Sequence, residues 1–143
     1  MMKNKLLTIM LIMLVAITLV GVIAIVVVTK FSGEVVANKE PSADEIVKSS
    51  VEIPEITTNL ASGDFIKISF TVQTDNEKAK EELEKRSFQV KNIIITELSE
   101  TKSDELKGKA GKEKFQETIE ADVNRLMQEG QVEKVYITSS ILQ

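Results

Sequence analysis

Residues 65–73 of the chain read FIKISFTVQ, and this stretch carries the strongest indication of the fold. Apolar and polar residues alternate along it, and a period of two is typical of a β-strand with one buried face. We therefore predict a sheet with its core on one side. The side chains expected to face that core are Ile66, Ile68, Phe70 and Val72.

Two further strands are predicted on either side of this stretch along the chain. Val51–Leu60 contains Pro54, which cannot donate a ladder hydrogen bond and therefore indicates an edge strand or a bend. The turn signal ASGD at residues 61–64 joins it to 65–73 as a hairpin. The last strand, 132–142, is expected to alternate with one face made of Val135, Ile137, Ser139 and Ile141.

Helical spacing of apolar residues fills the interval between the hairpin and the last strand. It predicts one helix from Glu77 to Leu98, capped by Asp75 or Asn76. Residues 90–98 are also compatible with a strand, and we prefer helix because the apolar stripe continues in register.

A polar joint over 99–112 is expected next, and then a second helix over 111–129 that Gly130 ends as a C-cap. The fold class is thus α+β, a small sheet with two packed helices. A short helix over 43–48 is the only element expected in the polar segment 31–50 that directly precedes the first strand.

The N-terminal part of the chain has a different composition. Residues 6–29 contain 20 apolar residues and no charge. As a helix they would rise about 36 Å, enough to cross a hydrocarbon core of about 30 Å. We predict a transmembrane helix, represented by Leu6, Leu14, Gly21 and Val28. A cleaved signal peptide, with VVA at 35–37 as the cleavage site, is the alternative, but its apolar region is typically only about 7–15 residues long.

Charge is divided between these two parts. Lys3, Lys5 and Lys30 are the only charged residues before Phe31, whereas 15 basic and 22 acidic residues follow, a net charge of −7. The positive-inside rule then places residues 1–5 in the cytoplasm as a tail. A transmembrane helix (6–29), a juxtamembrane linker (30–50) and an extracytoplasmic domain (51–143) follow.

Composition also limits the function. An acidic domain disfavours nucleic-acid binding, and a chain without Cys or His has no thiolate or imidazole for catalysis or zinc binding. The segment GKAGK at 108–112 fails the phosphate-loop pattern, because Glu113 stands where Ser or Thr is required. The acid pairs at 81–82 and 104–105 fit solvated helix faces better than a general acid and base. We expect no enzyme, no cofactor, no metal and no small-molecule substrate.

Four segments taken in order resemble the FliL family of flagellar basal body-associated, single-pass membrane proteins. They are the anchor with its short basic head, residues 58–60 before the alternating strand, residues 106–115 leading into a helix with Asn124, and the tail 130–143. The motif residues that carry the resemblance are Thr58, Asn59, Leu60, Gly111, Gly130, Val135, Tyr136 and Gln143.

The resemblance implies a stomatin-like (SPFH-like) domain and a mechanical role in the flagellar motor. Such proteins are expected in the inner cell membrane at the basal body, as homo-oligomeric rings around the stator complex that support its ion-conducting state during swimming and swarming. A generic stomatin-like scaffold unrelated to motility is an alternative. A membrane-anchored enzyme or sensor is a weaker one.

Four residues are candidates for the interfaces that such a role requires. Phe65 and Tyr136 are expected on outward strand faces as self-association anchors, although packing under a helix or the linker is an equal alternative. Ile53 and Leu60 belong to the segment expected nearest the membrane, and we assign them to contact with the stator.

Overall fold

The computed structural model describes the backbone of residues 2–31 and 40–143, and the side chains of residues 4–27 and 40–143. The chain forms two compact units, Met1–Glu40 and Pro41–Gln143. The first contains one helix, α1 (Met2–Phe31), and its portion Asn4–Val27 is long and apolar enough to cross a membrane. Thr8 and Thr18 donate their hydroxyl protons to carbonyls one turn earlier, which satisfies these polar groups inside the helix.

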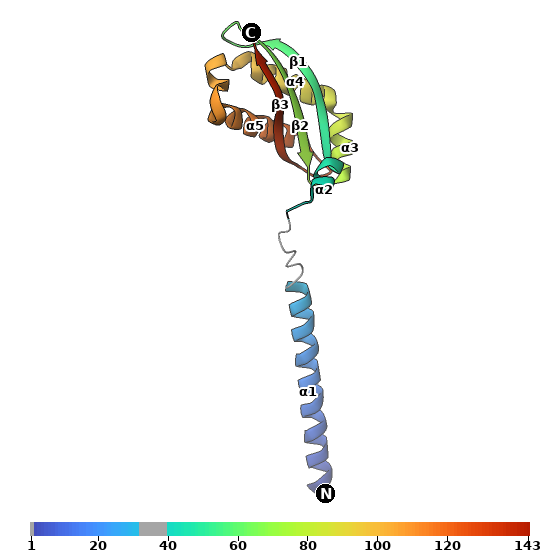
Figure 1. Ribbon diagram of the computed structural model, residues 1–143. Coiled ribbons are helices and arrows are strands. Elements are labelled where there is room, and N and C mark those ends of the chain that lie inside the picture. Colours follow the sequence, from blue (N-terminus) through green and yellow to red (C-terminus); the bar gives the residue numbers. More distant parts are fainter. Residues whose placement is uncertain (1, 32–39) are drawn as a thin grey trace. The chain divides into compact units, whose positions relative to one another are not determined.

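The second unit is built on a three-stranded antiparallel sheet in the order β1-β2-β3 (Figure 1). Its strands are β1 (Ser50–Asn59), β2 (Phe65–Thr74) and β3 (Val132–Leu142). The central strand β2 is the alternating stretch, and its predicted apolar face is buried. The prediction for this strand is confirmed.

Pro54 explains the irregularity of β1. The strand lies at an edge of the sheet, and its register against β2 shifts between Ile53 and Ile56. A residue without an N–H is tolerated at such an edge or bulge, so both expectations for Pro54 are met.

A second register shift corrects the expected faces of β3. Tyr136 and Ile137 pair with Thr71 and Phe70, whereas Ser139 pairs with Ser69, so Thr138 is an extra residue in the ladder. Residues paired across strands share a face. Ser139 and Ile141 therefore lie on the face of Tyr136 and not, as alternation predicted, on the face of Val135.

The predicted helix 77–98 is two helices. They are α3 (Glu77–Lys85), capped by the side chain of Asn76, and α4 (Ser87–Glu100). Arg86 separates the two helices, because it is the C-cap of α3 and the N-cap of α4. The break redirects the chain: α3 packs on β1 and β2, while α4 packs on β1 and the following long helix. Residues 90–98 are helical, as preferred.

That long helix is α5 (Gly108–Asn124), and its bounds also differ from the prediction of 111–129. It begins early because Gly108, at a φ of +72°, turns the chain out of a short 3-10 helix, η1 (Ser103–Leu106). It ends at Asn124, whose side chain bonds to Val132 of β3. Gly130 is therefore no helix cap. The expected short helix is α2 (Ala43–Lys48), which begins with a Ser42–Glu45 capping box.

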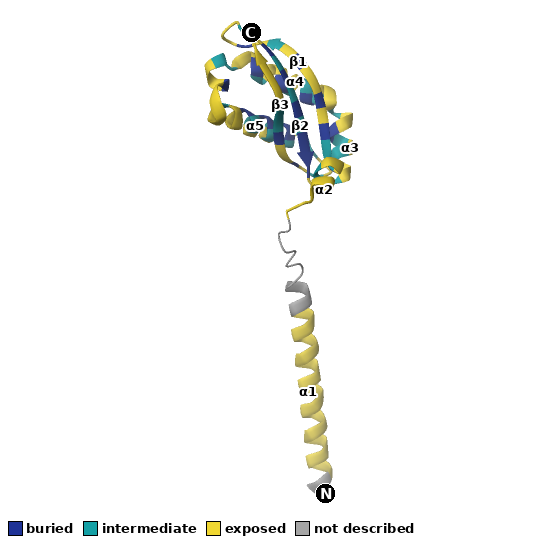
Figure 2. Ribbon diagram, viewed as in Figure 1, coloured by how far each residue is buried: buried dark blue, intermediate teal, exposed yellow. Residues whose placement is uncertain are grey.

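Helices α3, α4 and α5 cover one face of the sheet, and the buried residues lie between these two layers (Figures 1 and 2). At the centre the rings of Phe70 and Phe115 lie 6.2 Å apart. The opposite sheet face, called the outer face below, carries Glu52, Thr71, Tyr136 and Ile141 among its residues. The largest fully buried side chains include Phe70, Ile66, Ile68, Leu83, Ile94, Leu98 and Ile119.

Candidate functional site

The outer face contains both aromatic residues that the sequence marked as interface candidates. Phe65, at the start of β2, is 56% exposed, and Ile141, also exposed, lies on the neighbouring strand. The opposite end of the same face is different. There Tyr136 is only half-buried, because it lies within a small polar network.

This network holds Tyr136 in place. Its hydroxyl donates to Gln73 Oε1 at 2.9 Å, and the Gln73 amide donates to Glu133 Oε2 at 3.1 Å. The ammonium of Lys134 lies 5.4 Å from the centre of the tyrosine ring. Gln73 itself is buried and satisfied. Tyr136 is thus an ordered surface residue whose ring face is already partnered by a cation.

Ile53 and Leu60 cannot serve as the surface contacts expected of them. Only 2% of Ile53 and 4% of Leu60 is exposed, and both belong to the hydrophobic core. The sequence predicts that residues 51–60 form a membrane-proximal surface, but the apolar side chains of this segment face the helices. The exposed residues of the same strand are polar or proline, among them Glu52, Pro54 and Asn59.

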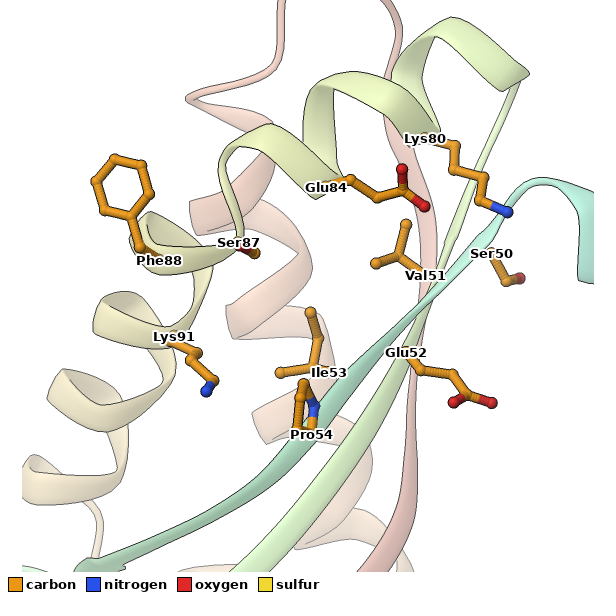
Figure 3. Close-up of a pocket in the computed structure, with 10 residues that line it drawn as sticks. All are labelled: Ser50, Val51, Glu52, Ile53, Pro54, Lys80, Glu84, Ser87, Phe88 and Lys91. Carbon is orange, nitrogen blue, oxygen red and sulfur yellow. The ribbon is translucent and has the colours of Figure 1, made fainter.

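A groove of about 630 Å³ runs beside the first half of β1 (Figure 3). Pro54 lines it from the strand, Lys80 from α3, and Phe88 and Lys91 from α4. Phe88 is 71% exposed although it begins a helix with a buried stripe. Phe88 is not among the candidates predicted from the sequence, because a single apolar residue off the buried stripe does not by itself indicate a functional role.

Two acidic side chains, those of Glu82 and Asp75, accept hydrogen bonds from the backbone of the turn that leads into β3. The Glu82 carboxylate accepts hydrogen bonds from the backbone N–H groups of Gln128 and Glu129 and from the Arg86 guanidinium. The backbone bonds above all, with the guanidinium, lower the pKa of Glu82 below its ordinary value. Asp75 accepts from the backbone N–H of Gln131 at 3.1 Å.

The motif glycines are explained by packing. A Cβ on Gly111 would collide with the carbonyl oxygen of Glu105, so α5 approaches η1 only with glycine there. A Cβ on Gly130 would collide with the side chains of Asp75 and Asn76, and its φ of +153° also favours glycine. Both glycines have structural roles, and the GKAGK segment belongs to the start of α5.

Other motif residues hold the strands together. Val135 is buried, and its carbonyl accepts a hydrogen bond from the Gln116 side chain. Gln143 exchanges two backbone hydrogen bonds with Phe65, at 2.8 and 2.9 Å. Thr58 is half-buried, whereas Asn59 is exposed at the end of β1. The motif residues of the sheet therefore lie at the end of β1 and on or beside β3, and Leu60 and Val135 among them belong to the core.

Carboxyl groups lie near one another in two other places, Glu97 with Asp122 and Glu120 with Glu117. Partial burial, and next the nearby Asp122, raise the pKa of Glu97, and partial burial with Glu117 raises that of Glu120. Within the described residues no three acidic side chains lie close enough to hold a metal ion. These groups lie along the α4 and α5 helices, where Glu97 lines a small hollow with Thr101 and Thr118.

The four residues chosen to represent the membrane segment all belong to α1. Leu6, Leu14 and Gly21 are exposed, as a lipid-facing helix requires. A Cβ on Gly21 would meet nothing within 4 Å. The side chain of Val28, the residues 32–39 of the linker and the alternative cleavage site at 35–37 lie outside the described residues.

Comparison with known proteins agrees with this architecture. The family model of the flagellar basal body-associated protein FliL matches residues 50–143, the whole sheet-and-helix domain. The flagellar protein FliL of Bacillus subtilis (strain 168) is 52% identical over 102 residues, covering 71% of this chain and 73% of that protein. The flagellar protein FliL of Aquifex aeolicus (strain VF5) is 27% identical over 93 residues, covering 63% and 58% respectively. The chain therefore belongs to the FliL family of flagellar basal body-associated proteins.

Proposed function

We propose that this protein is a structural component of the flagellar motor that forms a ring around the stator unit and supports its ion-conducting, torque-generating state. The observation that carries the proposal is the match of the family model to the whole domain, residues 50–143, which a membrane-spanning candidate helix precedes. A domain tethered beside the membrane is well placed to act on a membrane-embedded ion channel. Its role is mechanical, and it catalyses no reaction.

The proposed topology has the N-terminus in the cytoplasm and the domain outside. Lys3 and Lys5 precede the apolar segment without any acidic residue, and cytoplasmic ends of membrane helices carry such a basic excess. We further propose that the three-stranded sheet with helices on one face is a stomatin-like domain. The exposed part of its outer face and the open ends of its edge strands support assembly, because ring formation requires surface that the monomer leaves open.

A deletion strain tests the function. We expect swimming to slow and swarming to fail in its absence, most strongly in medium of raised viscosity, where the load on each stator is greatest. Complementation with the full chain should restore both, and complementation with the chain lacking residues 1–29 should not. Unchanged motility at both loads, in a parent strain shown to express the protein, would contradict the proposal.

A further inference from the structure

The outer edge of β3 is closed along its first half. The backbone N–H of Val132 donates to Asn124 Oδ1 at 2.7 Å, and Asn124 Nδ2 donates to the carbonyl of Val132 at 3.0 Å. The carbonyl of Val135 accepts from the Gln116 side chain. Two residues of α5 thus satisfy three backbone groups in this half of the strand, the N–H and carbonyl of Val132 and the carbonyl of Val135.

The second half of β3, Thr138–Leu142, is open. Gln143 exchanges both backbone hydrogen bonds with Phe65. In an antiparallel pair such residues alternate with residues whose N–H and C=O point away from the partner strand. Ser140 and Leu142 therefore direct these groups outward, and within residues 40–143 nothing is bonded to them. All five residues are exposed.

The opposite edge of the sheet is open at the same end. By the same alternation, Thr57 and Asn59 of β1 direct their backbone groups away from β2. The first half of β1 is blocked, because Pro54 has no N–H, the register shifts beside it, and Glu52 is charged. Prolines, bulges and charges are the features that prevent a strand edge from pairing.

Apart from the extra residue Thr138 at the start of one of them, both open segments lack these protective features. Residues 56–63 and 136–143 contain no charge and no proline, in a chain of which 28% is charged. They also lie at one level of the sheet, since Thr57 and Ile141 both pair with Lys67. Because β1 and β3 each run antiparallel to β2, they run parallel to each other.

We infer that Thr138–Leu142 of one copy pairs, in parallel, with the Thr57–Asn59 end of β1 in the next copy, so that the sheet continues from subunit to subunit. This inference rests on the proposed ring and names its interface. Parallel pairing at one level gives all subunits the same orientation, with every anchor on the same side. A head-to-tail contact of this kind closes into a ring when its rotation allows.

The anchor makes so short a contact effective. A few ladder hydrogen bonds give a weak association in free solution, but membrane attachment raises the local concentration and fixes the orientation of the partners. The exposed side chains of Phe65 and Ile141 add apolar area beside the joint on the outer face. Assembly should therefore depend on the full chain.

Cysteine crosslinking tests this pairing without background, because the chain contains no cysteine. Thr57→Cys and Ile141→Cys are combined in the full chain and oxidised in native membranes. Neighbouring strands lie about 4.8 Å apart, within the Cα separation that a disulfide spans. We expect a ladder of multimers that a reductant collapses to monomer. Asn59→Cys with Gln143→Cys, which share the row of Phe65, is a second pair that retains Ile141.

The matched control is Glu52→Cys with Ile141→Cys, because Glu52 is exposed on the same face of β1 at the blocked end. It should yield no ladder. Efficient dimers from Ile141→Cys alone would show symmetric β3–β3 pairing and overturn the inference. The inference would also be overturned if neither cysteine pair gave a ladder in folded, membrane-inserted protein while an amine-reactive crosslinker still captured multimers of the unmodified chain. In that case the ring would stand on another surface. No multimers by either method would overturn both proposals.

Discussion

At the scale of single residues, polar side chains of this domain act mainly on the backbone. Glu82 binds two backbone N–H groups of the turn before β3, although its sequence neighbours Glu81 and Lys85 suggested only a solvated helix face. The pattern of charges along α3 does not distinguish the two roles. Glu82 is the acceptor, and its two backbone donors lie 46 and 47 positions away in the sequence.

Glu82→Gln should destabilise the domain at neutral pH. The folded pKa of Glu82 lies below its unfolded value of about 4.3, so its stabilisation is present above that value and is lost as the pH falls through the folded pKa. We expect a lower urea midpoint for the variant at pH 7, and a difference between variant and parent that shrinks as the pH falls through the folded pKa. Glu81→Gln, on the exposed side of the same turn, is the control and should leave both midpoints unchanged.

At the scale of elements, the two edges of the sheet are treated differently. Pro54 and a register shift protect the start of β1, whereas α5 protects the start of β3 through Asn124. Proline in a strand is recognisable in a sequence, and its edge position was predicted from it. The role of Asn124 required knowing that α5 returns beside β3.

Asn124→Ala removes both hydrogen bonds to Val132 and leaves a strand N–H and carbonyl without their protein partner. We expect a loss of about 1–3 kcal/mol in the free energy of unfolding, and faster amide exchange at Val132 in the variant than in the parent. Hydrogen exchange followed by NMR or mass spectrometry measures both. Asn92→Ala, an exposed substitution on α4, is the control for a change that removes an amide but no strand contact. Equal protection of Val132 in the variant and the parent would contradict the role of Asn124.

At the scale of the whole molecule, an apolar helix and an acidic domain have separate tasks. α1 carries no charge between Leu6 and Val27, and the net charge of −7 lies beyond it. The two units are compact individually. This division agrees with a protein whose working part is held at the membrane.

Labelling of single cysteines tests the proposed topology. Lys109→Cys is exposed at the start of α5, and Asn4→Cys lies before the apolar segment. We expect a membrane-impermeant maleimide to label Lys109→Cys in intact cells, or in spheroplasts if there is an outer membrane, and Asn4→Cys only after lysis. The reverse pattern would place the domain in the cytoplasm and exclude an extracytoplasmic ring.

From the sequence alone, local composition and periodicity predict the membrane-spanning candidate and the three strands, and four ordered motif segments indicate the family. For residues 90–98 the sequence favours a helix and leaves a strand open, and the structure shows a helix. Only the tertiary structure decided the break at Arg86, the end of α5 and the faces of β3 beyond Thr138. It also placed Ile53 and Leu60 in the core and left the ends of β1 and β3 open. Each of these depends on a partner distant in the chain, and a single extra residue in a ladder reverses every side chain that follows it.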